Sequence, residues 1–595
     1  MKLLRLKITD PNGFRSLPCG FEHHFRTEWG LQDELLQPND FAPFICAGPN
    51  GSGKSNLLEA LAAIFYQLEV LRVRRSFLPE ALQDEALDVS PVAFELDYLI
   101  RVPAEYRGPD NPQWAKVGIH KNAGESVRFL WENQSEFSTD VSETFKGSHV
   151  DNLLPQYVLG YSSGENEILS LPFFKMRFVQ FDEYRNALTR QLSYSGHPET
   201  RLAYLDNSFS QAILLCNLLF QDEATLQPFH EDVGIEALRE FRIILRRSIE
   251  LQPEQLAAFA SEDDNARQSL EDIVKSNPAL YAESDDLGNT RYRLNLLQLL
   301  EGDEKSSLVV SALKRCATLI YLDDANDSLV LDYWVNDATQ QAFRENFDGS
   351  ALALFQAFQV LLTLNLYSVS DALKADLYTS TSHYVSETVP TLASDQRIMR
   401  FKFVYISKQG VGEPVMLKEL SDGEHQLLHS LGLCLLFRDT NSLFLLDEPE
   451  THFNPDWRAN FISRLRQCLP GNGECAQEML VTTHTPFLIS DSKPDKVLMF
   501  AKDDTTGAVS LSHPNYNTLG ASINKITMNT FGKRETIAGH AHAILNEFRR
   551  RFEHGTEDKD SLIMEIHQKL GDSVEKVLLI KAIDADEPGN GEVQG

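Results

Sequence analysis

Residues 48–55 read GPNGSGKS, a glycine-rich loop that ends in a lysine and a serine. Glycines at 48, 51 and 53 let the backbone curl so that its N–H groups point inward, toward an anion. The loop follows the apolar segment FAPFICA and leads into an apolar helix, whose positive N-terminal end faces the same anion. The segment therefore predicts a phosphate-binding loop.

The side chains of this loop have distinct predicted roles. Lys54 is expected to contact the β and γ phosphates of ATP, and Ser55 to supply a hydroxyl to Mg²⁺. Asn50 lies near the position where such loops meet the oxygen that bridges these two phosphates. The predicted nucleotide-binding residues of the loop are Gly48, Pro49, Asn50, Gly51, Ser52, Gly53, Lys54, Ser55 and Asn56.

A pair of carboxylates follows a second apolar segment, in LFLLDEPE at 443–450. Such a segment predicts a buried parallel strand, and its carboxyl end is where α/β sheets bind ligands. Asp447 is expected to hold Mg²⁺, directly or through water. Glu448 is then the candidate base that orients and deprotonates the attacking water, the step that separates hydrolysis of ATP from binding alone.

Two further segments complete the set, LSDGE at 420–424 and VTTHTP at 481–486. Ser421 and Gly423 precede an apolar helix and offer a second anion site, although a plain helix cap has the same sequence. Because the chain already has one phosphate loop, we expect Ser421 to reach the γ phosphate held by another subunit. His484 follows an apolar strand and is expected to couple Glu448 to the γ phosphate, although a lone histidine is usually structural.

Other polar clusters complete no site. Possible metal ligands are His23 and His24, His540 and His542, and Asp323, Asp324 and Asp327, but their spacing matches no metal centre and a solvated surface accounts for them more simply. Basic clusters occur at Arg72, Arg74 and Arg75, at Arg246 and Arg247, and at Arg549, Arg550 and Arg551. Each is either a nucleic-acid or partner contact or a solvated helix face.

The composition favours a globular protein that does not bind nucleic acid over its whole surface. Acidic residues outnumber basic ones, 86 against 55, for a net charge of -31. The seven cysteines form no CxxC pair, and the first residues lack the charged and apolar regions of a signal peptide. No apolar run is long enough to span a membrane, so we expect a cytoplasmic protein without a membrane contact.

The order of the segments predicts an α/β core that is split in sequence. Strands are expected at 92–102, 127–133, 398–408 and after VTTHTP, and an edge strand at KLLRLKI near the N-terminus. Between them lie helical patterns, among them SFSQAILLCNLLF, GIEALREFRIILRRSIEL and SALALFQAFQVLLTLNLYSVSDAL, interrupted by strand-like pieces at 317–324 and 329–335. The predicted parts are an N-terminal lobe at 1–185, a mainly helical insertion or lid at 186–397, a C-terminal lobe at 398–520 and a helical tail at 521–595.

In this order, the four segments resemble those of the ABC-type ATPases of the SMC, RecF and OLD branch. The resemblance covers residues 1 to about 185 and 398 to 520, and it implies a P-loop core of the ABC type. Within the branch the chain resembles the PtuA-like ATPases of Septu and retron systems, which are encoded beside restriction or HNH nuclease genes. Shared features are the chain length, YSSGEN at 161–166, LSDGE, and GKRETIAGHAHAIL in the tail.

That resemblance implies an oligomeric ATPase of an anti-phage defence system, built from ATP-sandwiched dimers, that gates a separately encoded HNH-type nuclease. Some relatives also engage a reverse transcriptase with its RNA-DNA product. The chain departs from the family at Asn454, where relatives carry a histidine before the proline, and its Q-loop glutamine is not evident, since both YSSGEN and Gln180 are candidates.

The alternative is a DNA-repair or recombination ATPase of the RecF or SMC type that acts directly on DNA and shares every catalytic segment. A continuous basic surface would favour it, whereas the acidic composition favours gating of a protein partner. The tail is too short for an added nuclease domain of the OLD type, and no nuclease cluster is evident in the chain.

Overall fold

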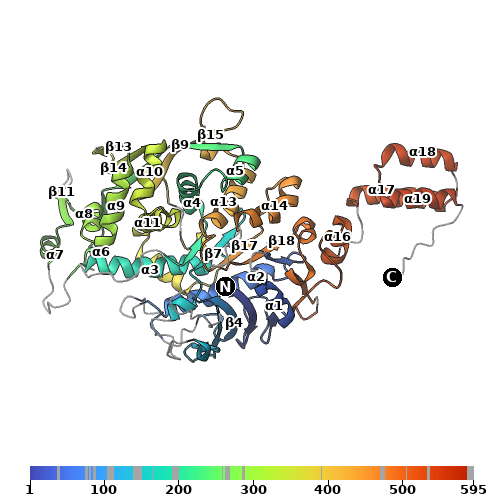
Figure 1. Ribbon diagram of the computed structural model, residues 1–595, viewed down its shortest axis with the longest axis horizontal. Coiled ribbons are helices and arrows are strands. Elements are labelled where there is room, and N and C mark those ends of the chain that lie inside the picture. The colour runs from blue at the N-terminus through green and yellow to red at the C-terminus, as the bar shows by residue number, and fades with distance from the viewer. Residues whose placement is uncertain are drawn as a thin grey trace.

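A seven-stranded sheet, parallel except at one edge, forms the centre of the protein (Figure 1). In sheet order its strands are β20 (Val509–Ser512), β19 (Val497–Lys502), β3 (Phe44–Ala47), β18 (Glu478–Thr483), β17 (Ser442–Asp447), β7 (Tyr157–Ser162) and β8 (Leu202–Tyr204). The three innermost strands β3, β18 and β17 are fully buried. Segments from both ends of the chain therefore meet in one mixed α/β core, as the sequence predicts.

The computed structural model describes residues 1–585 apart from 37–40, 74–77, 79–81, 85–88, 103–112, 138–149, 165–166, 191–199, 258, 261–268, 285–287, 383, 390–391, 470–475, 504, 533–536 and 556. Arg74 and Arg75, together with Glu165 and Asn166 of YSSGEN, lie outside the described residues.

A second, antiparallel sheet lies beside the centre and contains the predicted strands at 92–102 and 127–133. Its order is β2 (Glu22–His24), β1 (Lys2–Ile8), β4 (Phe94–Arg101), β5 (Trp114–Lys121) and β6 (Arg128–Trp131). The prediction that KLLRLKI forms an edge strand is wrong, because β1 pairs with β2 on one side and with β4 on the other. Its basic residues are accommodated by ion pairs, such as those from Arg5 to Glu22, Glu95 and Asp97.

Helices cover the central sheet and carry the apolar periodicity seen in the sequence. The helices of this part are α1 (Glu28–Leu36), α2 (Lys54–Val70), α3 (Leu171–Thr189), α4 (Asn207–Phe220), α5 (Gln227–Asp232), α11 (Ala351–Thr363), α12 (Asp371–Thr379), α13 (Asp422–Leu436), α14 (Pro455–Cys468) and α15 (Pro486–Ser490). Helix α4 packs against both α11 and α13. Within the described residues, the segment Ala351–Ser368 is long and apolar enough to cross a membrane, but 61% of it is buried inside the protein, as in a core helix.

The region between the two lobes contains more strand than the sequence predicts. One sheet has the order β13 (Leu319–Asp323), β14 (Ser328–Trp334), β9 (Ile235–Arg246), β15 (Met399–Lys408) and β16 (Val415–Met416). A smaller sheet has the order β10 (Ser248–Leu251), β12 (Thr290–Asn295) and β11 (Leu280–Ser284). Helices α6 (Pro253–Ala257), α7 (Leu270–Ser276), α8 (Leu296–Glu301), α9 (Glu304–Cys316) and α10 (Asp337–Asn346) complete the region.

The helix predicted for GIEALREFRIILRRSIEL is wrong, because this segment forms β9 and β10. Its buried residues Ile235, Leu238 and Phe241 recur every three positions, which resembles a helical face. The spacing arises from irregularities in the pairing of β9 with β15, which shift the register between Lys402 and Lys408. A bulged strand loses strict alternation, so its apolar pattern can imitate that of a helix.

Two contacts cross the predicted domain boundaries at 185 and 398. Strand β8, from the predicted insertion, extends the central sheet beside β7. Strand β15, from the predicted C-terminal lobe, pairs along most of its length with β9 of the insertion. The division into folding units stays a prediction, but the insertion shares sheets with both lobes.

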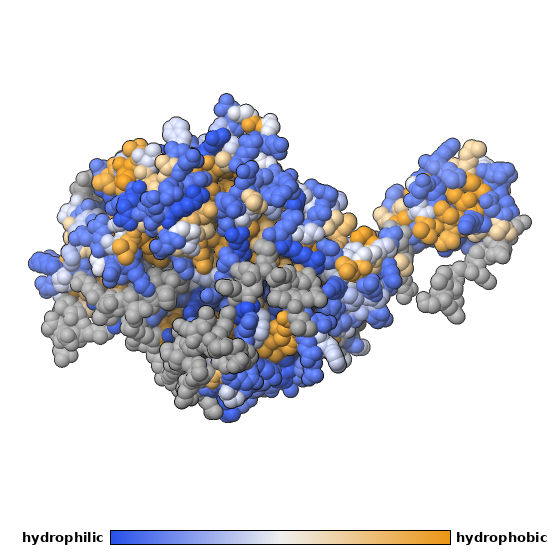
Figure 2. Space-filling model, in the orientation of Figure 1, coloured by the Kyte–Doolittle hydropathy of each residue, from blue (hydrophilic) through white to orange (hydrophobic). Residues whose placement is uncertain are grey.

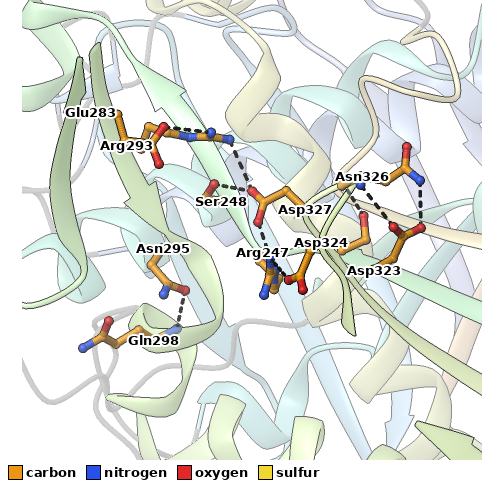
Figure 3. A network of polar contacts seen from close by, with 11 residues as sticks. Arg247, Ser248, Glu283, Arg293, Asn295, Gln298, Asp323, Asp324, Asn326 and Asp327 are labelled. Carbon is orange, nitrogen blue, oxygen red and sulfur yellow. Dashed lines mark hydrogen bonds and ion pairs between the residues drawn. The ribbon is translucent and has the colours of Figure 1, made fainter. Parts of the chain in front are cut away.

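A network of ion pairs joins the two sheets of the inserted region (Figure 3). Asp327, in the turn between β13 and β14, accepts hydrogen bonds from Arg247 Nε at 3.0 Å and Arg293 Nη2 at 3.2 Å, and also from the Ser248 hydroxyl. Asp324 accepts from Arg247 Nη2 at 2.9 Å. Asp324 and Asp327 are thus paired with arginines, whereas Asp323 accepts hydrogen bonds from Asn326. No metal-binding group of acidic, histidine or cysteine residues occurs among the described residues.

The predicted helical tail forms α16 (Ile523–Phe531), α17 (Gly539–Glu553), α18 (Lys559–Lys569) and α19 (Val574–Asp584). Helix α16 packs on the main body, whereas α17, α18 and α19 stand apart from it (Figure 1). These three helices enclose a small core of their own, formed by Leu545, Phe548, Leu562, Ile566, Leu570, Leu579 and Ile583.

Candidate functional site

The carboxyl ends of β3, β18 and β17 bring the predicted catalytic segments together. Gly48 follows β3, Glu448 follows β17, and His484 follows β18, which lies between the other two strands. A cleft of about 340 Å³ opens at this edge of the sheet. The described residues that line it are Asn50, Gly51, Gly53, Lys54, Ser55, Asn56, Ile168, Glu448 and His484.

Glycine is required in the loop at two positions. Gly53 has a φ of 95°, and a Cβ there would lie 2.6 Å from Ser16 Oγ. Gly48 has a φ of 155°, and a Cβ there would lie 2.5 Å from the carbonyl oxygen of Phe500. Only a residue without a side chain allows the loop to follow this path between β3 and α2.

The charged end of Lys54 lies deep in the loop, where its Nζ atom donates to the carbonyl oxygens of Gly48 and Pro49 at 3.1 Å each. Burial lowers the pKa of Lys54, and the nearby carboxylates of Glu448 and Asp447 oppose that shift. Beside it, the hydroxyl of Ser52 is buried and has no hydrogen-bond partner within the described part of the chain. The concave backbone of the loop thus surrounds the ammonium group of Lys54 and the buried hydroxyl of Ser52.

Asp447 is fully buried at the end of β17 and is held by two hydroxyl groups. Ser55 Oγ donates to Asp447 Oδ1 at 2.7 Å, and Thr482 Oγ1 donates to the same oxygen at 2.6 Å. Burial raises the pKa of Asp447, against these two hydrogen bonds. A buried carboxylate beside a serine hydroxyl supplies oxygen ligands of the kind that Mg²⁺ prefers.

Glu448 adopts a left-handed backbone conformation, with a φ of 50°. Such a conformation is costly for a residue with a side chain and is held here by Thr482, whose Oγ1 accepts from Glu448 N at 3.0 Å. The backbone turn carries the Glu448 side chain into the cleft, where Oε1 lies 2.7 Å from His484 Nε2. The hydrogen bond from His484 lowers the pKa of Glu448, against the effect of its partial burial.

The predicted second anion site lies elsewhere. Ser421 is the N-cap of α13, and its Oγ accepts from Glu424 N at 3.4 Å. A Cβ at Gly423 would lie 2.8 Å from the carbonyl oxygen of His452, so this glycine permits close packing on the segment after β17. Among the described residues that line the cleft, neither Ser421 nor Gly423 is found.

The two Q-loop candidates and Asn454 lie in different elements of the structure. Ser163, in YSSGEN, follows β7 and donates its backbone N–H to the carbonyl oxygen of Asp447 at 3.1 Å. Gln180 lies within α3 and is buried there. Asn454 caps α14 by accepting from Trp457 N at 2.8 Å. Ser163 of YSSGEN therefore contacts the end of β17 directly.

Sequence reasoning missed two threonines that organise the site. Thr482 joins Asp447 to the backbone of Glu448, and Thr483 donates to the buried carboxylate of Glu450. Both belong to VTTHTP, where the histidine drew attention and the threonines resembled ordinary strand residues. The sequence signal for their role was the presence of two adjacent threonines at the end of a predicted strand that precedes His484.

Comparisons with known proteins match parts of this chain. A protein-family model described as an AAA domain, putative AbiEii toxin, Type IV TA system, matches residues 256–490, which include LSDGE, LFLLDEPE and VTTHTP. Septu protein PtuA of Bacillus thuringiensis is 24% identical over 135 residues, 22% of this chain and 32% of PtuA. The chain resembles the PtuA-like ATPases of the SMC, RecF and OLD branch. The matched segment spans about a third of that PtuA.

A solved structure with a similar course is that of an SmcHead bound to the C-winged helix domain of ScpA. It is 10% identical and covers 86% of this chain and 97% of its own length, with a TM-score of 0.29. A score this low carries no argument about this chain. The PtuA-like interpretation of the site therefore depends on the residues of the cleft and on the sequence matches.

Proposed function

We propose that this chain binds and hydrolyses ATP within an anti-phage defence system and that its nucleotide state gates a separately encoded HNH-type nuclease. The observation that carries the proposal is the 2.7 Å contact between His484 Nε2 and Glu448 Oε1 beside the phosphate loop. A site that only binds ATP has no need of a carboxylate oriented in this way. The similarity to Septu protein PtuA supports the defence setting.

The residues of the cleft fit a nucleotide triphosphate and Mg²⁺. Lys54 and the spare hydroxyl of Ser52 would hold phosphate, because phosphate oxygens accept from both and compensate the buried ammonium charge. Ser55 and Asp447 would hold Mg²⁺, which when bound neutralises charge that develops on the phosphates.

Glu448 would then act as the base that takes a proton from the attacking water. Its lowered pKa keeps the carboxylate ionised at neutral pH and therefore able to accept that proton. His484 would fix the direction of the carboxylate, and the left-handed backbone at Glu448 brings the same group into the cleft. Lys54, Glu448 and His484 are thus the proposed catalytic residues.

The absence of Ser421 and Gly423 from the described lining of the cleft supports a shared site. In the proposed ATP-sandwiched dimer, Ser421 and the backbone at Gly423 of one subunit would meet the γ phosphate bound by the other. The N-terminus of α13 is suited to this role, because its first N–H groups point out of the helix.

The charge distribution of the chain favours a protein partner over direct binding to DNA. Arg247 is paired with Asp324 and Asp327, Arg551 with Glu557 and Glu565, and Arg72 with Glu69. These contacts neutralise part of each basic cluster, and the chain as a whole carries a charge of -31. Septu protein PtuA is not described as a retron component, and the proposal includes no reverse transcriptase.

The test is a phage-protection assay with the natural operon. Lys54→Ala and Glu448→Gln should each abolish protection while the protein is still produced, and an HNH-type gene should lie beside this one. If the purified chain instead bound duplex DNA tightly and its ATPase rate rose with DNA, the repair alternative would replace this proposal.

A further inference from the structure

The strand β13, which forms one edge of the five-stranded sheet, exposes an unbroken apolar sequence. Leu319, Ile320, Tyr321 and Leu322 are 54%, 45%, 37% and 55% exposed. Figure 2 shows apolar side chains gathered at the surface in this region, where Figure 1 places β13 and β14. Edge strands of soluble proteins usually carry lysine, proline or other charges that prevent pairing, and this strand has none before Asp323.

The core of the sheet stops one strand before this edge. On β14, the side chains of Leu329, Leu331 and Tyr333 are 2%, 0% and 1% exposed. On the same face, Ile320 lies directly opposite Leu331 and Leu322 opposite Leu329. The outermost strand therefore extends a buried face into solvent, where Ile320 and Leu322 lack the cover that their neighbours have.

The hairpin that carries this strand is held in place. Asp327, in its turn, has a left-handed backbone with a φ of 45° and is bound by Arg247, Ser248 and Arg293 (Figure 3). At the middle of the sheet Arg242 pairs with Asp332 of β14. A strand fixed in this way loses little conformational freedom when another strand pairs with it.

The charges at the two ends of β13 are complementary. Arg315 lies in the last turn of α9, just before the strand, and Asp323 lies at the other end of the strand, whereas the neighbouring Lys314 and Asp324 are already paired with Glu301 and Arg247. In an antiparallel pairing of two copies, each acidic turn meets the basic end of the other copy. The centre of the contact is apolar, so two chains of net charge -31 can approach there without opposing like charges.

We propose that β13 is an interface with a second copy of this chain, in which the two edge strands pair antiparallel about a two-fold axis. With the axis at Ile320, Leu319 of each copy lies opposite Tyr321 of the other, and Thr318 opposite Leu322. The two five-stranded sheets then form one continuous sheet. This interface is separate from the ATP cleft and needs no nucleotide.

The first test is the mass of the full chain in solution without nucleotide, measured by sedimentation velocity. The chain, with a mass of 67.2 kDa, should sediment as an assembly of at least two copies, and Ile320→Lys should halve its mass. Met564→Lys is the matched control, because Met564 is 62% exposed on α18 and lies outside the proposed interface. A monomeric unsubstituted chain, or an Ile320→Lys variant of unchanged mass, overturns the proposal and leaves the edge for a strand of another protein.

The second test does not depend on a disruptive substitution. Side chains directly opposite each other on paired strands have Cβ atoms about 5 Å apart, so Ile320→Cys should give a covalent dimer with a short bismaleimide. The reaction is run in a Cys19→Ser background, because Cys19 is exposed. Met564→Cys in the same background should remain a monomer on a denaturing gel, and equal cross-linking of the two variants contradicts the interface. Because no nucleotide is present, failure here leaves the proposed ATPase activity untouched.

Discussion

The Nε2 atom of His484 lies 2.7 Å from Oε1 of Glu448, and the two residues follow neighbouring parallel strands. The contact joins a carboxylate on a left-handed backbone to a ring from the next strand, so the direction of the carboxylate is fixed from two sides. This relationship decides which of the acidic residues after β17 can meet a water molecule in the cleft. Glu448 lines the cleft, whereas Glu450 is buried away from solvent.

Replacing Glu448 with glutamine should lower the ATPase rate by about 10²–10⁴-fold, the usual contribution of a positioned base. The amide keeps the size of the side chain but cannot take a proton, so ATP should still bind. Single-turnover hydrolysis and equilibrium nucleotide binding measure the two effects separately. Glu413→Gln, on an exposed loop, is the control. Hydrolysis at an unchanged rate in Glu448→Gln would refute the assignment of the base.

Removing His484 should change the pH dependence of hydrolysis. The hydrogen bond from His484 lowers the pKa of Glu448, and the base works only when ionised, so the unsubstituted protein loses activity only when acidified below that lowered pKa. In His484→Ala the pKa rises toward its ordinary value, and the acidic limb of the pH–rate profile should move to higher pH. If the pH–rate profiles of the two proteins had the same acidic limb, the contact with His484 would not lower the pKa of Glu448.

Much of the site could be predicted from sequence because its chemistry restricts residue types tightly. Phosphate binding at Lys54 needs glycines in fixed positions, and a buried apolar strand seldom ends in two adjacent carboxylates unless they bind a ligand. The structure brings these residues together with His484, as the order of the segments predicts. The role of Thr482 could not be predicted, because a threonine in a strand is common and its two hydrogen bonds depend on which strands are neighbours.

The secondary structure could be predicted where the apolar periodicity is regular, and the prediction was wrong where the periodicity is irregular. Helices α4 and α11 and strands β13 and β14 follow their patterns. Strand β9 does not, because irregular pairing with β15 displaces its buried residues to a spacing of three. The exposure of β13 could not be predicted either, because an apolar strand is expected to be buried and only the sheet order places this strand at an edge.

Glu450 should make the folded protein less stable as the pH rises. Burial raises the pKa of Glu450 to about 7, against the hydrogen bond from Thr483, so the folded state retains a proton that the unfolded chain loses near pH 4.5. The stabilisation is present below pH 4.5 and is lost between about pH 4.5 and 7. Glu450→Gln should remove this dependence, about 1–3 kcal/mol between pH 5 and 8. Chemical unfolding of both proteins at several pH values measures this dependence. Parallel plots of the free energy of unfolding against pH would contradict the prediction.

Gly53→Ala should prevent the phosphate loop from forming without unfolding the protein. A methyl group there would lie 2.6 Å from Ser16 Oγ, and the φ of 95° is unfavourable for any residue with a side chain. Nucleotide affinity should fall at least about tenfold, with a loss of stability of about 1–2 kcal/mol. Gly571→Ala, where added atoms meet open space, is the matched control for isothermal titration with ATP. Equal affinities in the two variants would show that the loop conformation is not needed for binding.

Asp447→Asn should separate stability from Mg²⁺ binding. The asparagine oxygen can still accept from Ser55 and Thr482, and the substitution removes a buried charge whose pKa is raised by burial, so the nucleotide-free protein should unfold at the same temperature or higher. Mg²⁺ with ATP should raise the Tm of the unsubstituted protein, because a ligand that binds only the folded state stabilises it by an amount that grows with the ratio of ligand concentration to Kd. The variant should lose most of that rise, and EDTA should abolish it in both proteins. A full rise in Asp447→Asn would mean that this carboxylate is not the one that holds the ion.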